Sequence, residues 1–199
     1  MLHKYNQFFY HCTQNRQIFS QSPQKLAVFA VSFGADAKKY QKIIKNDFTA
    51  GCGVCVTIYL TGCPIHCPGC HNPELWDPST GTEVTYDTLY ELVEDINANG
   101  IQRNLCIMGG EPFADYNLQS VAKLTSYVRE KCPNIKIYVW TGFQFEDMVC
   151  PSALTILKNI DYLIDGPYIQ EQRDITLKMR GSKNQRILEL KDGKILREL

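Results

Sequence analysis

The sequence lacks an excess of charge of either sign and lacks any long hydrophobic run. Lys and Arg together number 21 and Asp and Glu together number 21, so the formal net charge is zero. Proteins that bind nucleic acids or anionic membranes by bulk electrostatic attraction usually carry a net positive charge, so we expect neither partner. The longest uncharged apolar stretch, Leu26 to Phe33, is far shorter than the roughly 20 residues that span a bilayer. We therefore predict no transmembrane helix.

The pattern of a secretory signal is also missing. The residues before Leu26 are mostly amides and aromatics, and no small-residue cleavage site follows the apolar stretch closely. We therefore expect a cytoplasmic protein in a reducing environment, where disulfides are rare. The nine cysteines are odd in number and several are clustered, which indicates metal or thiol chemistry. A chain of 199 residues buries roughly 70% of its unfolded surface, so it needs no disulfide to fold.

The chain divides into an N-terminal extension and one α/β domain. Residues 1–38 show neither a helical nor a strand period, so we predict a mobile extension outside the fold. From 39 to 199, short apolar runs alternate with amphipathic segments, as in a parallel sheet or barrel. Strands are predicted at 54–60, 105–108, 135–140 and 162–164, helices at 85–97, 118–131 and 151–158, and a hairpin at 186–190 and 194–196.

Each of the four predicted parallel strands ends in a polar segment that contains glycine. These segments are Thr61-Gly62-Cys63, Gly109-Gly110-Glu111, Thr141-Gly142 and Asp165-Gly166. In parallel α/β architectures, ligands bind at the carboxyl ends of the strands. The sequence therefore predicts one shared site at this edge of the sheet.

Three cysteines follow the first strand with the spacing C-x3-C-x2-C. Cys63, Cys67 and Cys70 lie in a loop stiffened by Pro64 and Pro68, so their thiolates can converge on one soft metal centre. A structural zinc site and most electron-transfer clusters use four protein ligands, whereas three leave one metal position open to a substrate. A zinc site remains the alternative, with its fourth ligand drawn from His66, His71, Cys52 or Cys55.

The run from 61 to 76, TGCPIHCPGCHNPELW, resembles the radical S-adenosylmethionine superfamily and, within it, the activating proteins of anaerobic ribonucleoside-triphosphate reductase. The likeness extends over about residues 40 to 190 and includes Gly-Gly-Glu-Pro at 109–112, Val-Trp-Thr-Gly at 139–142 and Arg-Gly-Ser-Lys-Asn-Gln at 180–185. Many members of the superfamily carry an aromatic residue just before the third cysteine. This chain has Gly69 at that position, and in this it resembles the short activating proteins. The resemblance implies a partial, open (β/α) barrel of the radical SAM type over 39–199.

The same resemblance implies a site. A [4Fe–4S] cluster is expected on Cys63, Cys67 and Cys70, and S-adenosylmethionine is expected to chelate the open iron through its amino and carboxylate groups. The residues expected to bind this cofactor are Gly109, Gly110 and Glu111 at its amino group, the backbone of Gly69, Cys70 and His71 along its adenine, and Thr141 and Asp165 at its ribose hydroxyls or methionine portion.

The implied reaction is reductive cleavage of S-adenosylmethionine to methionine and a 5′-deoxyadenosyl radical, which abstracts an α-hydrogen from a glycine of the reductase. The matching region of about 150 residues is shorter than the about 250 of a full barrel, so an open side could admit a protein loop. A second ferredoxin-like insertion is missing, which implies an external one-electron donor such as flavodoxin or ferredoxin. Two alternatives are a small-molecule radical enzyme of the deazaguanine synthase type and a non-catalytic cysteine-rich zinc or electron-transfer module.

Two further cysteines form a C-x-x-C pair just before the first strand. Cys52 and Cys55 could be redox-active or could bind metal, and we favour a role outside the cluster, which includes buried structural thiols. Cys106, in a strand, and Cys132, at a helix end, are interpreted as small core residues.

Overall fold

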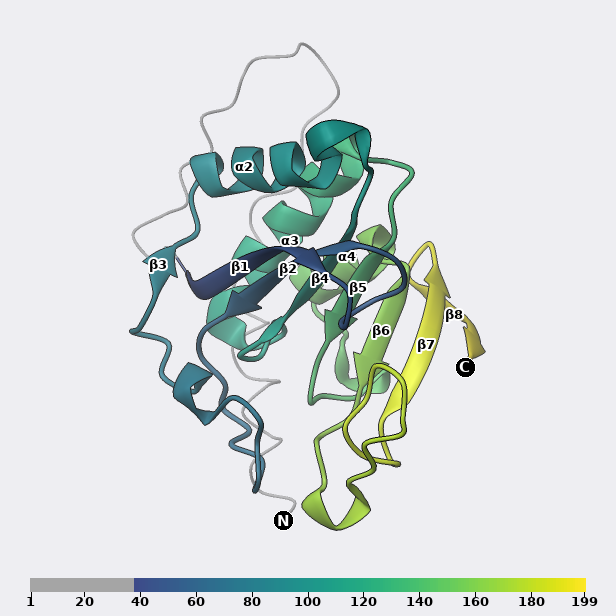
Figure 1. Cartoon of the computed structure of the whole chain (residues 1–199). Helices are drawn as coiled ribbons and strands as arrows, with labels where there is room; N and C mark the ends of the chain where they lie inside the picture. Colours follow the sequence, from purple (N-terminus) through teal and green to yellow (C-terminus); the bar gives the residue numbers. More distant parts are fainter. Residues whose placement is uncertain (1–37) are drawn as a thin grey trace.

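The computed structural model describes residues 38–199, which form one mixed sheet of eight strands with helices packed on it (Figure 1). The strand order is β3-β1-β2-β4-β5-β6-β7-β8. The predicted extension, apart from Lys38, lies outside the described residues. The strands are β1 (Lys39–Asp47), β2 (Cys55–Leu60), β3 (Thr82–Glu83), β4 (Asn104–Gly109), β5 (Ile137–Trp140), β6 (Tyr162–Asp165), β7 (Arg186–Lys191) and β8 (Lys194–Glu198).

The helices connect the central strands. The α-helices are α2 (Tyr86–Asn97), α3 (Asp115–Lys131) and α4 (Pro151–Asn159), and the short 3-10 helices are η2 (Pro73–Leu75), η3 (Ala98–Gly100), η4 (Phe145–Asp147) and η5 (Gln170–Gln172). No helix in this part of the chain has the length and apolar character needed to cross a membrane.

The centre of the sheet is the predicted βα alternation. Strands β2, β4, β5 and β6 pair in parallel and are joined in turn by α2, α3 and α4. Antiparallel strands flank them: β1 and β3 beyond β2, and β7 and β8 beyond β6. The hairpin is confirmed, with Asp192 and Gly193 at φ +52° and +75° as a primed turn requires. The prediction missed β1 and β3, and barrel closure stays a prediction.

The two faces of the sheet differ in what covers them. On one face, alternate strand residues such as Ile58, Ile107 and Val139 pack in the main core with helix residues such as Leu92 and Leu124. On the other face a smaller cluster forms, and among the described residues none of its buried members comes from a helix: Ala50, Cys55, Cys106, Tyr138, Ile164 and Ile187. We call this second side the helix-free face.

Local signals explain where the helices begin. Thr85 caps α2: its hydroxyl accepts from the Thr88 amide at 3.3 Å, and the Thr88 hydroxyl accepts from the Thr85 amide at 3.1 Å. Helix α3 begins at Asp115, three residues before the predicted start at Leu118. The Asp115 carboxylate lies in the first turn, where its negative charge interacts favourably with the positive end of the helix dipole.

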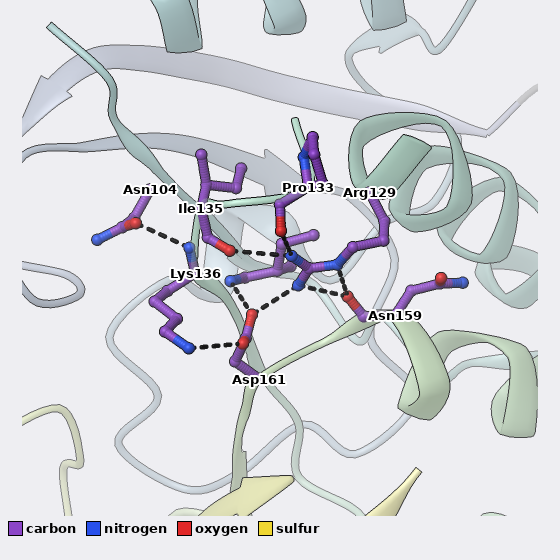
Figure 2. A network of polar contacts seen from close by, with 8 residues as sticks. Asn104, Arg129, Pro133, Ile135, Lys136, Asn159 and Asp161 are labelled. Atoms are coloured by element: carbon purple, nitrogen blue, oxygen red, sulfur yellow. Dashed lines mark hydrogen bonds and ion pairs between the residues drawn. The ribbon is translucent and has the colours of Figure 1, made fainter. Parts of the chain in front are cut away.

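A polar network fixes the amino-terminal ends of the central strands (Figure 2). Arg129, in the last turn of α3, donates to the carbonyls of Pro133, Ile135 and Asn159 and to the Asp161 carboxylate at 2.6 Å. The same carboxylate binds the Lys136 ammonium at 3.0 Å. Helix α3 is thereby attached to β5 and β6 at one end of the sheet, and the opposite end is left to the loops that carry the predicted site.

Candidate functional site

The carboxyl ends of β2 and β4 are joined by close backbone contacts. The Gly110 amide donates to the Leu60 carbonyl at 2.8 Å, and the Glu111 amide donates to the Gly62 carbonyl at 2.7 Å. A Cβ on Gly110 would lie 2.4 Å from the Gly62 carbonyl oxygen, so this position requires glycine. The glycine at 110 therefore allows the ends of β2 and β4 to approach each other this closely.

Glu111 links the ends of β4 and β5. Its carboxylate is buried and accepts from the Phe113 amide at 2.9 Å, the Thr141 hydroxyl at 2.7 Å and the Gly142 amide at 2.8 Å. Burial raises the pKa of Glu111 to about 7, because desolvation disfavours the charged form more than these three hydrogen bonds favour it. Thr141, predicted at the cofactor, thus holds Glu111 in this structure.

The cysteine loop closes on itself at its base. The amides of Gly62 and Cys63 donate to the carbonyls of Leu75 and Trp76 at 2.8 and 3.1 Å. Within the loop the His66 ring stacks on Trp76 with centroids 4.5 Å apart. One face of the His66 ring, a candidate zinc ligand in the sequence, is thus covered by Trp76.

The three loop thiols form no disulfide within residues 38–199 and are partly accessible. Burial, and more weakly the negative charge of Glu111, raises the pKa of Cys63 to about 11, and burial also raises the pKa of Cys67. Backbone amides donate to all three sulfurs: those of Ile65 and His66 to Cys63, that of Tyr168 to Cys67, and that of Asn72 to Cys70 at 3.4 Å. Hydrogen bonds of this kind tune the potential of a cluster held by thiolates.

The cysteine loop rests against the carboxyl ends of the later strands. A Cβ on Gly142 would lie 2.4 Å from the Ile65 side chain, so the loop packs on the end of β5. Gly69, at φ +73°, lies so close to the Gln170 side chain that a Cβ would be 2.3 Å from its oxygen. His71 is exposed. The structure thus brings Gly69 and the three cysteines to the same edge as Glu111 and Thr141.

Asp165 is buried at the end of β6 and is bound by a residue that sequence reasoning missed. Arg186, paired with it in the antiparallel β6–β7 register, donates to one carboxylate oxygen at 2.9 Å and to the other by a short bond. The Phe145 amide also donates to Asp165, at 2.9 Å. Arg186 extends to Glu146 at 2.8 Å, and its pKa is raised by the hydrogen bonds to both carboxylates. Arg186 was predicted only as the first residue of a hairpin strand, and the pattern of apolar and polar residues along that strand does not indicate a contact with Asp165.

The Arg-Gly-Ser-Lys-Asn-Gln motif completes the edge. The Gln185 side chain accepts from the Gly181 amide at 2.8 Å and donates to the Gly166 carbonyl at 3.1 Å. Asn184 donates to the Pro167 carbonyl at 2.8 Å. Two buried polar atoms of the motif, Arg180 Nε and Asn184 Oδ1, have no partner within the described part of the chain. Such atoms are where a bound ligand or water is expected.

The chemistry of the donor set fits an iron–sulfur cluster, because such clusters are held by cysteine thiolates. Across 38–199 no group of three or more His, Cys, Asp and Glu side chains lies close enough to hold one metal ion. Cys63, Cys67 and Cys70 supply three soft thiolate ligands.

Comparison with known proteins identifies the class. Residues 49–188 match the family model of a 4Fe-4S single cluster domain, so the chain belongs to this class of iron–sulfur proteins. Proteins named anaerobic ribonucleoside-triphosphate reductase-activating protein are similar over most of the chain. That of Enterobacteria phage T4 is 37% identical over 155 residues, which are 77% of this chain and 96% of the relative.

Two bacterial proteins of the same name are similar to this chain over nearly the same length. The protein of Vibrio cholerae is 35% identical over 147 residues, 73% of this chain and 94% of the relative. That of Escherichia coli K12 is 31% identical over 147 residues, 73% of this chain and 95% of the relative. The chain therefore belongs to the family of anaerobic ribonucleoside-triphosphate reductase-activating proteins, as the sequence motifs indicated.

Proposed function

We propose that this protein cleaves S-adenosylmethionine reductively and installs a glycyl radical on an anaerobic ribonucleoside-triphosphate reductase. The observation that carries the proposal is the loop of Cys63, Cys67 and Cys70, three unpaired thiols at the carboxyl ends of the parallel strands and inside the matched cluster domain. These thiols would hold a [4Fe–4S] cluster with one iron free for the cofactor. When bound, the cluster supplies the electron that cleaves the sulfonium.

The chain's own residues prepare the place for the cofactor. Glu111 Oε1 accepts two hydrogen bonds in this structure and Oε2 accepts one, so Oε2 has capacity for one more donor, such as the cofactor ammonium. An ammonium beside Glu111 would favour its charged form and lower its pKa from about 7. Thr141 and the Gly142 amide orient this carboxylate.

The polypeptide substrate requires an accessible side. We propose that the sheet is a partial, open barrel and that domain 39–199 receives the glycine-bearing loop of the reductase on the helix-free face. Support comes from the distribution of the helices, whose residues pack with one face of the sheet in the main core. We further propose a cytoplasmic location and an external one-electron donor of the flavodoxin or ferredoxin type.

Anaerobic reconstitution tests the function. The full chain is loaded with iron and sulfide, reduced and mixed with S-adenosylmethionine, and methionine and 5′-deoxyadenosine are quantified. Paramagnetic resonance then measures the glycyl radical after the reductase is added. We expect each of Cys63→Ala, Cys67→Ala and Cys70→Ala to abolish cleavage, whereas Cys150→Ala, which removes a buried thiol outside the site, retains it.

The outcomes separate the alternatives. Cleavage without a glycyl radical on the reductase would favour a small-molecule radical enzyme. Failure of the loaded protein to cleave S-adenosylmethionine at all would favour an electron-transfer or zinc module. Cleavage that survives substitution of each loop cysteine would show that the cluster lies elsewhere.

A further inference from the structure

A second group of thiols lies on the helix-free face, at the amino-terminal side of the sheet. Cys55 begins β2, Cys106 lies in the neighbouring strand β4, and Cys52 lies in the loop that leads into β2. Cys55 and Cys106 have no exposed surface, whereas Cys52 is exposed. The proposed function uses none of the three.

Two of these sulfurs contact each other. A Cβ on Gly51 would lie 3.0 Å from both Cys55 Sγ and Cys106 Sγ, so the two sulfurs lie against the same α-carbon. The Cys106 thiol donates a hydrogen bond to the Cys55 sulfur, which lowers the pKa of Cys55 and, with burial, raises the pKa of Cys106. Of the two thiols, Cys55 therefore has the lower pKa and ionises first.

The loop places the backbone of Cys52 beside the Cys55 thiol. Gly53 has φ +73° and turns the chain, and the Cys55 thiol donates to the Cys52 carbonyl oxygen at 3.8 Å. The Asn104 side chain donates to that same carbonyl at 2.7 Å, and Asn104 in turn belongs to the network of Figure 2. The Tyr138 side chain is hydrogen-bonded to Cys52. The loop backbone is thus anchored to β4, with one exposed and one buried thiol.

We propose that Cys52 and Cys55 form a reversible thiol-oxidation site that reacts with small disulfides such as oxidised glutathione. First, the Cys52 thiolate attacks one sulfur of oxidised glutathione, a mixed disulfide forms and one glutathione thiolate leaves. Next, the Cys55 thiolate attacks the Cys52 sulfur, the Cys52–Cys55 disulfide forms and the second glutathione thiolate leaves. Two protein thiols lose two protons and two electrons, and one disulfide is reduced to two thiols.

The environments of the two thiols assign their order. Glutathione reaches the exposed Cys52 and is excluded from Cys55, so every exchange with solvent passes through Cys52. In the reducing direction glutathione attacks the Cys52 sulfur, and Cys55 leaves as the thiolate that Cys106 stabilises by its hydrogen bond. A core that required only small apolar side chains would need neither the exposed thiol nor the donor to Cys55.

Anaerobic titration of the cluster-loaded full chain tests the site. The protein is equilibrated in buffers of reduced and oxidised glutathione, quenched with acid, alkylated and cleaved with chymotrypsin. Cleavage after Phe48 and Tyr59 releases a peptide whose only cysteines are Cys52 and Cys55. We expect this peptide to lose two hydrogens in one two-electron transition and to regain them with excess reduced glutathione.

Variants separate the roles. Cys55→Ser should accumulate a stable glutathione adduct on Cys52, and Cys52→Ser should show neither a disulfide nor an adduct on Cys55. Cys106→Ala should slow conversion of the mixed disulfide to the protein disulfide by about tenfold, since Cys55 loses thiolate character. Cys132→Ala, a buried thiol elsewhere, is the matched control and should behave as the parent. A mixed disulfide on Cys52 that persists in the parent protein, or glutathione on Cys55 when Cys52 is serine, would overturn the proposal.

Discussion

Glu111 carries the clearest consequence of burial at the residue scale. Its pKa in the folded protein, about 7, lies above its ordinary value of 4.5, so the folded state binds the proton more tightly than the unfolded state. The associated stability is fully present below pH 4.5 and is lost as the pH rises through 7. The difference corresponds to about 3 kcal/mol, since one pH unit is worth about 1.4 kcal/mol.

We therefore predict that the cluster-free protein loses about 2.5 kcal/mol of unfolding free energy between pH 5 and pH 8 through this group, and that Glu111→Gln removes most of this dependence. Urea denaturation at each pH measures it. Glu83→Gln, at an exposed glutamate in β3, is the control and should keep the parent's profile. A profile that is unchanged in Glu111→Gln would contradict the assignment.

Asp165 and Arg186 form the second residue-scale unit. The carboxylate has no exposed surface, and its guanidinium partner is 29% exposed. Arg186→Met leaves a buried charge uncompensated, so we expect a loss of about 3 kcal/mol in chemical denaturation. The double variant Asp165→Asn with Arg186→Met should lose much less than the sum of the single losses. Additive losses would show that the pair is not coupled.

The same positions test the expected contacts with S-adenosylmethionine. Asp165→Asn and Thr141→Ala are each titrated with the cofactor in the cluster-loaded protein, with folding verified by circular dichroism. We expect each to weaken cofactor binding several-fold, Thr141→Ala because Glu111 loses the hydrogen bond that orients it. If both bind the cofactor like the parent, these residues have a purely structural role.

At the element scale, the network around Arg129 determines how α3 joins the sheet (Figure 2). The guanidinium reaches three backbone carbonyls and one carboxylate, and each of these groups would lose this donor in Arg129→Met, although Asp161 keeps its bonds to Lys136 and Ile137. We expect a loss of about 2 to 3 kcal/mol, measured as a lower thermal midpoint. Lys131→Met, in the same turn, removes a surface ion pair with Glu130 and an exposed cation–π contact with Tyr127, and should change stability by less than about 1 kcal/mol.

The elements themselves show what sequence can predict. The helices and the four parallel strands follow from local periodicity, caps and turn residues such as Thr85 and Asp192-Gly193, which act over a few residues. Strand β1 escaped because it is a flanking strand, where Lys39, Lys42 and Lys45 interrupt the apolar pattern. The strand ends and the cysteine loop were predicted as one edge. Contacts such as Glu111–Thr141 and Asp165–Arg186 join residues 30 and 21 positions apart and depend on strand order, which periodicity does not encode.

At the scale of the whole molecule, the two ends of the sheet have different tasks. The amino-terminal ends of β5 and β6 are fixed to α3 by the Arg129 network. The carboxyl ends carry loops in which buried polar atoms of Trp76, Arg180 and Asn184 have no partner within residues 38–199. Binding at the carboxyl ends should therefore order one end and leave the other unchanged.

Hydrogen exchange of the anaerobic protein, with and without cluster and S-adenosylmethionine, measures this difference. Cofactor at about 100 times its dissociation constant stabilises the folded state by about 2.7 kcal/mol. We expect added protection in 61–76, 109–113, 141–146 and 166–185, and none at 104 or 129–137, which the network already orders. The apo form of Cys67→Ala is the control, since it should gain no protection from S-adenosylmethionine. Protection centred on 104 and 129–137 instead would place the cofactor at the opposite end of the sheet, because bound ligand protects the backbone that it contacts.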